Sequence, residues 1–302
     1  MKSIVCYAAI LFCGALSTTS WAQKDPQTLS INVDLVNVLF TVADRNGRFI
    51  TSLEKDDFKV LEEDRPQTIS NFSNETNLPL SIAMVFDTSA SIQARLKFEQ
   101  EAASEFFYTT LRRGTDKALV VTFDRSVALA QDYTDNAELL TRAVGGARAG
   151  GGTAMFDAVY QAMIRKLVDQ KGRHVAVIIS DGDDNSSDKN IDEVIEMAQK
   201  TDTVIYAVST NSPELFGSDS DRGNKYLKRL SDETGGRLFT PTKIDDLTKS
   251  FVEIGKELRS QYTLGYRSTN TKRDGTYRKI RITAANKQLK VRARDGYFAP
   301  RQ

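Results

Sequence analysis

Five residues with a carboxylate or a hydroxyl group could bind a ligand together: Asp87, Ser89, Ser91, Thr153 and Asp181. Each follows an apolar or glycine-rich stretch by a few residues at most. The first three form an Asp-x-Ser-x-Ser sequence after the apolar residues 80–86, and the last comes shortly after the apolar residues 175–179. The threonine follows three consecutive glycines at 150–152. Asp-x-Ser-x-Ser alone is common, but its combination with the other two segments in this order indicates one shared site.

The chemistry of this set is that of a hard-cation site. Two carboxylates and three hydroxyls offer oxygen ligands without nitrogen or sulfur, which suit Mg²⁺, Mn²⁺ or Ca²⁺ better than zinc, and Mg²⁺ is the ion we expect. Two carboxylates leave a divalent ion under-neutralised when its other ligands are neutral hydroxyls. The ion then attracts an Asp or Glu carboxylate of a partner protein, which is a binding mechanism and not a catalytic one. In the alternative to a metal site, the serines and the threonine are helix N-caps and the aspartates are turn residues. Caps and turns do not require these residues to follow one another in this order along the chain.

Residues 79–258 predict the elements that hold these side chains. Apolar, strand-like segments alternate with amphipathic helical segments, which is typical of an α/β fold with a Rossmann-like, doubly wound, mostly parallel sheet. Residues 127–130 follow residues 118–123 after a link too short for a helix, and therefore predict an antiparallel edge strand. Ligands bind such sheets at the carboxyl ends of strands where the strand order reverses. If the strands before Asp87 and Asp181 are neighbours, the two carboxylates emerge side by side.

Segments 23–78 and 259–302 are β-rich, because apolar residues alternate along them with a period of two. The alternating residues include Val36, Val38, Phe40 and Val42 in the first segment and Tyr262, Leu264 and Tyr266 in the second. Neither segment is long enough to close a core easily, and together they have the length of one β-sandwich. We expect a sandwich built from both segments, with the α/β domain inserted, in preference to two separate small β units, because chain termini usually lie close together.

The N-terminus has the pattern of a secretory signal peptide at residues 1–22. Lys2 precedes the apolar residues 4–13, and Ser20-Trp21-Ala22 provides small residues for a cut after Ala22. The apolar run is shorter than the ~20 residues that a membrane-spanning helix needs. We therefore expect an exported protein, periplasmic or secreted. Both cysteines lie inside this segment, so the mature chain would have no disulfide.

Composition excludes several classes of protein. The 302 residues include 41 Lys and Arg against 40 Asp and Glu, and a basic nucleic-acid binder needs a positive excess that this balance lacks. A hydrophobic fraction of 40% excludes bulk disorder. After the N-terminal segment, no apolar run is long enough to span a membrane. The chain therefore predicts a folded protein without a transmembrane segment in its mature form.

Because it contains Asp-x-Ser-x-Ser, Thr153 and Asp181 in this order, the segment 79–258 resembles a von Willebrand factor A domain. All five positions match the metal-ion-dependent adhesion site of that family. The resemblance implies that Ser89, Ser91 and Thr153 touch the metal, whereas Asp87 and Asp181 often act through water. The whole chain also resembles exported bacterial proteins related to this domain, whose C-terminal motifs are like Tyr262-x-Leu264-Gly265-Tyr266 and Arg294-x-Gly296-Tyr297.

Two enzymatic alternatives are weaker on the residues alone. His174 could serve a serine as a base, but it precedes the apolar strand that Asp181 follows, which places it on the order of 20 Å away. A phosphotransferase with Asp87 as nucleophile would want a lysine in the site, and Lys189 is the nearest in sequence. The glycines at 150–152 lack the Gly-Lys-Ser/Thr of a nucleotide-binding loop.

Two sets of charged residues could either bind a ligand or simply be exposed to solvent. Asp183 and Asp184 could tune the charge of the site or bind a second cation, but a solvated acidic loop is favoured. Five basic residues alternate with apolar ones near the C-terminus and could bind acidic polymers or lipid head groups, although a solvated sheet face is favoured. They are Lys279, Arg281, Lys290, Arg292 and Arg294.

The sequence therefore predicts a divalent-cation-dependent protein-binding or adhesion module that is not an enzyme. Its partner would be a protein that supplies an Asp or Glu carboxylate to the metal. The alternatives that stay open are a metal-dependent phosphoryl-transfer or hydrolytic enzyme and a purely structural assembly subunit.

Overall fold

The computed structural model describes residues 35–74, 78–211 and 221–301. The predicted signal peptide at 1–22 lies outside these residues. Among the described helices, none combines the length and the apolar character needed to cross a membrane. The described residues form an α/β part with a central sheet and two smaller antiparallel sheets.

A six-stranded sheet forms the centre of the α/β part, with strand order β10-β9-β8-β5-β6-β7. Its strands are β5 (Leu80–Asp87), β6 (Lys117–Phe123), β7 (Val127–Thr134), β8 (Arg173–Ser180), β9 (Thr203–Ser209) and β10 (Leu238–Phe239). Neighbouring strands are parallel except β6 and β7, which are antiparallel. The doubly wound, mostly parallel sheet with an antiparallel edge strand is therefore confirmed. Strand order reverses at β5, because β6 lies on one side of it and β8 on the other.

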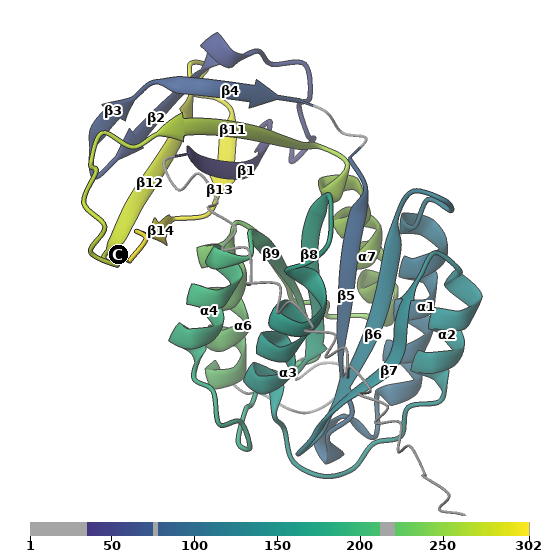
Figure 1. Cartoon of the computed structure of the whole chain (residues 1–302). Helices are drawn as coiled ribbons and strands as arrows, with labels where there is room; N and C mark the ends of the chain where they lie inside the picture. Colours follow the sequence, from purple (N-terminus) through teal and green to yellow (C-terminus); the bar gives the residue numbers. More distant parts are fainter. Residues whose placement is uncertain (1–34, 75–77, 212–220, 302) are drawn as a thin grey trace, which may run out of the picture. The chain divides into compact units, whose positions relative to one another are not determined.

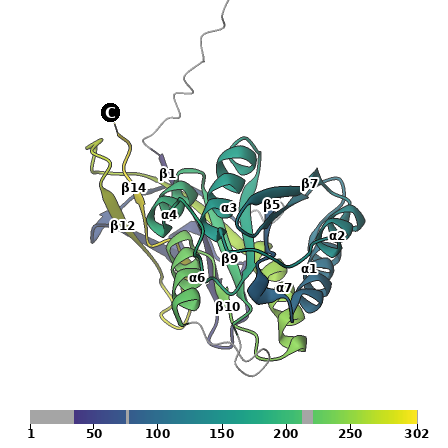
Figure 2. The ribbon, with the colours of Figure 1, turned by 90° about the horizontal axis from the view of Figure 1, so that it is seen from below.

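Helices cover both faces of this sheet (Figure 1). One face carries α1 (Leu96–Thr110), α2 (Ala137–Gly145) and α7 (Ile244–Leu258), and the other carries α3 (Met155–Ala162), α4 (Ile191–Lys200) and α6 (Asp221–Thr234). Figure 2 shows the same two groups of helices from below, on either side of the strands. Every residue of β5 is buried, because alternate side chains enter the two apolar cores.

Two four-stranded antiparallel sheets form the second part, with strand orders β13-β1-β11-β4 and β14-β12-β2-β3. Their strands are β1 (Leu35–Ala43), β2 (Phe58–Glu62), β3 (Arg65–Gln67), β4 (Ile69–Ser73), β11 (Gln261–Arg267), β12 (Tyr277–Ala284), β13 (Lys290–Ala293) and β14 (Gly296–Phe298). Both sheets combine strands from before and after the α/β part, which confirms the sandwich built from both segments. One apolar core lies between them, and the rings of Phe40 and Tyr262 stack there with centroids 5.2 Å apart.

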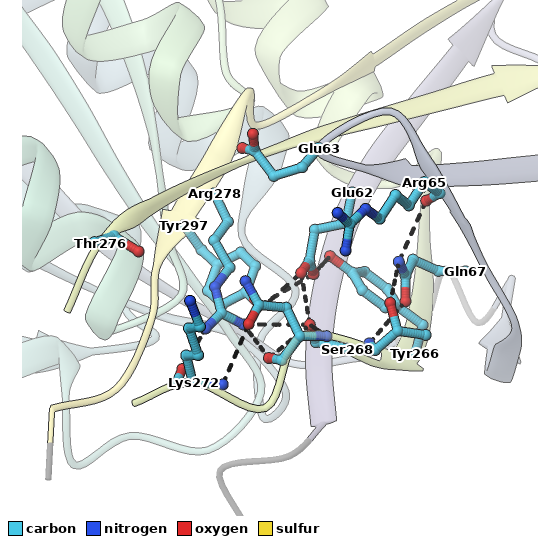
Figure 3. Close-up of polar contacts among 12 residues, drawn as sticks. Glu62, Glu63, Arg65, Gln67, Tyr266, Ser268, Lys272, Thr276, Arg278 and Tyr297 are labelled. Atoms are coloured by element: carbon cyan, nitrogen blue, oxygen red, sulfur yellow. Dashed lines mark hydrogen bonds and ion pairs between the residues drawn. The ribbon is translucent and has the colours of Figure 1, made fainter. Parts of the chain in front are cut away.

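A polar network lies beside that core (Figure 3). The Glu62 carboxylate, at the end of β2, accepts hydrogen bonds from the hydroxyls of Tyr266 at 2.9 Å, Tyr297 at 3.1 Å and Ser268 at 2.5 Å. It also pairs with the Arg278 guanidinium at 3.7 Å, and the side chains of Glu62 and Arg278 are only 2% and 3% exposed. Since these residues come from β2 and from the C-terminal segment, the network joins the two chain segments of the sandwich.

Hydrogen bonds also join the sandwich to the α/β part where α7 ends and β11 begins. Arg173, the first residue of β8, donates to the carbonyl oxygens of Leu258 at 3.1 Å and Gln261 at 3.0 Å. We propose the domain boundaries that the sequence predicts, with a break at residue 79 and another after residue 258.

Candidate metal site

Asp87 and Asp181 lie at the ends of neighbouring strands. In the parallel pairing of β5 with β8, Phe86 lies opposite Ile179. Asp87 therefore ends β5 and Asp181 comes one residue after β8, at the same edge of the sheet. Both are buried, with exposed fractions of 0% and 5%. This edge is also where the strand order reverses, which is the position expected for a ligand site in such a sheet.

Hydrogen bonds connect four of the five predicted ligands. The Ser91 hydroxyl donates to Oδ2 of Asp181 at 2.6 Å, and the hydroxyl oxygens of Ser89 and Ser91 lie 3.0 Å apart. Asp87 accepts from the backbone N–H of Ser89 at 2.7 Å through Oδ1 and from the Ser180 hydroxyl at 2.5 Å through Oδ2. Since the single proton of Ser91 goes to Asp181, Ser89 donates to Ser91, and both serine oxygens keep lone pairs for a cation.

Thr153, the fifth predicted ligand, lies in a loop that is hydrogen-bonded to the loop after β5. The N–H of Gly150 donates to the carbonyl of Thr88 at 2.8 Å, and the N–H of Ala90 donates to that of Gly151 at 3.3 Å. Gly151 has φ of +78°, a conformation that glycine adopts without strain. Thr153 is 4% exposed, and its N–H donates to the side-chain oxygen of Asn185 at 3.1 Å. The loop after β5, the loop with residues 150–153 and the loop after β8 are therefore hydrogen-bonded to one another. The hydrogen bond of Thr153 in this group is made by its backbone N–H and not by its side chain.

The sequence did not reveal two charged residues that lie beside this site. Arg95 donates from Nη2 to Oδ2 of Asp181 at 2.8 Å, and its Nε lies 3.4 Å from Oε1 of Glu99. The side chains of Arg95 and Glu99 are 2% and 0% exposed. Glu99 lies on the same face of α1 as the buried Ala103 and Phe106, and this helical spacing is the signal that could have indicated its burial.

Burial dominates the electrostatics of the site. It raises the pKa of Asp87 to about 6, against hydrogen bonds from Ser180 and Ser89 that lower it, and the charge of Asp181 adds to the rise. Burial also raises the pKa of Glu99 well above its ordinary value. The Arg95 charge opposes that shift, whereas the charges of Asp87 and Asp181 reinforce it. The site is therefore a buried group of acids beside a guanidinium.

This donor set fits a divalent cation. Carboxylates and hydroxyls are the hard oxygen ligands that such ions prefer, and a cation would relieve the repulsion between the buried carboxylates. The described residues contain no cluster of three or more His, Cys, Asp or Glu side chains suited to a metal. The candidate site has a different composition, because three of its five predicted donors are hydroxyl groups.

The neighbouring acidic residues have structural partners. Asp183 pairs with Arg222 of α6, and the Asp184 carboxylate accepts from the backbone N–H of Phe156 at 2.9 Å in the first turn of α3. An acid at a helix N-terminus stabilises the helix through its free N–H groups and its dipole. Asp184 is therefore held by α3, and the interpretation of a merely solvated loop is wrong for this residue.

The candidate base His174 and the candidate lysine Lys189 of the two enzymatic alternatives contact other residues and not the site. The two ring nitrogens of His174 lie 2.7 Å and 2.9 Å from the carbonyl oxygens of Thr201 and Gln170. His174 is the second residue of β8, at the end opposite Asp181. The Lys189 ammonium pairs with Glu193 at 2.7 Å.

The basic residues near the C-terminus do not form one solvated stripe. Lys279, Arg281 and Lys290 are exposed, as favoured from the sequence. Arg292 instead pairs with the buried Glu257 at 2.7 Å. Arg294 is 9% exposed and donates to the carbonyl oxygen of Asn37 at 2.6 Å and to the Asp202 carboxylate at 3.1 Å. These two arginines hold the sandwich together and against the α/β part.

Comparison with known proteins identifies the α/β part. Residues 81–253 match the model of the von Willebrand factor type A domain. A sequence search among curated proteins finds no match. Similar solved structures include proximal thread matrix protein 1 from the mussel byssus with a zinc-occupied metal-ion-dependent adhesion site motif, at 18% identity and a TM-score of 0.52. That match covers 66% of this chain and 50% of the mussel protein, so the chain spans about half of its length.

A second similar structure is the von Willebrand factor domain of the type V pili tip protein Mfa5 from Porphyromonas gingivalis. It is 12% identical, with a TM-score of 0.50, and the match covers 60% of this chain and 95% of that domain. At such identities the likeness concerns the fold.

Proposed function

Because this chain belongs to the von Willebrand factor type A domain family, we propose that it is a divalent-cation-dependent protein-binding or adhesion module. The observation that carries this proposal is the hydrogen-bonded chain from Ser89 through Ser91 to Asp181, at the carboxyl ends of β5 and β8. Asp87 and the Thr153 loop adjoin that chain.

We assign the roles that the family resemblance implies. Ser89, Ser91 and Thr153 would bind the cation directly, and Asp87 and Asp181 would act through water. The cation, for which we propose Mg²⁺, supplies an electrophilic position for a carboxylate. The mussel protein holds zinc at its own motif, which supports a divalent ion at this place in the fold without selecting one.

The chain's own residues define how a partner would approach. Ser91 is exposed, whereas Asp87, Ser89, Thr153 and Asp181 are buried. A partner carboxylate would therefore arrive beside Ser91. Ser91 is fixed by its bond to Asp181, so its lone pairs are oriented before the partner binds, which lowers the ordering cost of binding.

We propose binding without catalysis, by an exported protein in the periplasm or outside the cell. The partner would be a protein with an accessible Asp or Glu. The engagement of His174 and Lys189 with other residues supports a site without a general base or a phosphate-binding lysine.

A capture experiment tests this function. The purified chain is immobilised and exposed to the proteins of the native envelope fraction in Mg²⁺ or in EDTA, alongside Thr153→Ala and the control Thr109→Ala on the exposed side of α1. We expect a partner that is retained in Mg²⁺ by the wild type and by Thr109→Ala, and lost in EDTA and with Thr153→Ala. Capture that is unaffected by both EDTA and Thr153→Ala would contradict the proposal.

A further inference from the structure

A fully buried guanidinium contacts the candidate metal site from inside the protein. Arg95 precedes α1, and its side chain is 2% exposed. Its Nη2 donates to Oδ2 of Asp181 at 2.8 Å, the same oxygen that accepts the Ser91 hydroxyl at 2.6 Å. A partner protein cannot reach this arginine, and Arg95 contacts the site through Asp181.

Arg95 is held from a second side. Glu99, one turn further along α1, has an Oε1 that lies 3.4 Å from Nε of Arg95, and its side chain is 0% exposed. Two buried carboxyl groups therefore flank the guanidinium, and its charge lies beside the site in the metal-free protein.

We propose that Arg95 is a built-in counter-ion of the metal site, which holds Asp181 in place in the metal-free protein and weakens the binding of the divalent cation. This inference rests on the proposed function, because it concerns the same site. Arg95 is a positioning residue, since it acts through Asp181 and contacts neither the cation nor the partner.

The physical reason is competition between positive charges. Buried carboxylates without a partner are costly, and Arg95 neutralises part of that charge when no metal is present. The same positive charge repels a divalent ion a few ångströms away, and the repulsion is stronger inside a protein than in water. Loss of the charge should therefore destabilise the metal-free protein and tighten its binding of a cation.

The test measures Mn²⁺ binding by isothermal titration calorimetry and the melting temperature in EDTA. Arg95→Gln removes the charge and keeps a hydrogen-bond donor, Arg95→Met removes both, and Arg95→Lys keeps the charge. We expect Arg95→Gln and Arg95→Met to bind Mn²⁺ about tenfold more tightly than the wild type and to melt at a lower temperature in EDTA. Arg95→Lys should bind Mn²⁺ within about twofold of the wild type.

Arg112→Met is the matched control. Arg112 makes an ion pair of the same i, i+4 spacing, with Asp116, whose Oδ1 accepts from the N–H of Leu80 at the opposite end of β5. This variant should lose stability without a change in Mn²⁺ affinity.

The outcomes separate this inference from the proposed function. If the wild type binds Mn²⁺ and both Arg95→Gln and Arg95→Met bind it equally or more weakly, the counter-ion role is wrong and the metal site stands. If Arg95→Met does not fold, Arg95→Gln decides in the same way. If the wild type takes up no Mn²⁺ at all, the proposed function and this inference both fall.

Discussion

Replacement of Glu62 by glutamine tests whether the buried network in Figure 3 holds the sandwich together. The substitution keeps the size of the side chain and removes its charge. The new amide oxygen could still accept one or two of the hydrogen bonds that Tyr266, Tyr297 and Ser268 now donate. The amide could not neutralise Arg278, which is 3% exposed.

The expected loss of stability is set by the burial of Arg278, which would keep its charge without the Glu62 carboxylate. Loss of one partner from a buried ion pair costs about 3–5 kcal/mol, because the other charge stays buried. Arg278 also donates to the carbonyl oxygen of Asn270 at 2.6 Å, which compensates part of the loss. We therefore expect a decrease of about 3 kcal/mol in the free energy of unfolding. For a chain of 302 residues, that corresponds to a fall of about 5 °C in the melting temperature.

Urea denaturation of Glu62→Gln beside Glu63→Gln measures this effect. Glu63 is the next residue, is exposed, and accepts from the backbone N–H of Lys279 at 2.6 Å. The control should stay within about 0.5 kcal/mol of the wild type, as exposed substitutions usually do. Equal stability of the two variants would show that the buried Glu62 charge adds nothing to the stability of the fold, contrary to this prediction.

Two further predictions concern the α/β part. Burial raises the pKa of Asp116, but hydrogen bonds from Arg112 and Arg259 outweigh it and lower this pKa from 3.8 to about 2. The stabilisation, about 1–2 kcal/mol, is present above pH 4 and lost as the pH falls through 2. Denaturation curves from pH 5 to pH 2 should therefore show a steeper loss for the wild type than for Asp116→Asn, and parallel curves would be the contrary result. Gly236→Ala should destabilise the fold by more than about 2 kcal/mol, because its Cβ would lie 2.0 Å from the carbonyl oxygen of Ile205. Gly145→Ala, which meets nothing within 4 Å, should be tolerated, and equal melting temperatures of the two variants would contradict this expectation.

The sequence predicts the strands of this fold wherever burial imposes a pattern. The apolar runs of β5 and β8 reflect burial on both faces of a sheet, and the alternation in β1 and β11 reflects burial on one face. The two three-residue strands β3 and β14 have no such pattern. The charged residues 62–66 indicate that β2 ends there, but the left-handed conformation of the turn has no signal, because Glu63 and Asp64 adopt φ of +48° and +60° without a glycine.

For the candidate site, the sequence indicates which oxygen-bearing residues share an edge of the sheet, because strand ends determine that edge. The helical spacing of Glu99 with the buried Ala103 could have indicated that Glu99 is buried. The sequence could not indicate Arg95, since a charged residue at a helix start is usually solvated, and its burial depends on how α1 packs beside Asp181. The same holds for Arg294, whose partners lie on two separate segments of the chain.

We propose that five oxygen-bearing side chains together hold one divalent cation. Calorimetric titration of Mn²⁺ into the wild type, Thr153→Ala and Thr109→Ala tests it most directly. We expect one Mn²⁺ per chain for the wild type and for Thr109→Ala, and at least a tenfold weaker affinity for Thr153→Ala. Absence of stoichiometric uptake by the wild type, or unchanged affinity in Thr153→Ala, would contradict it.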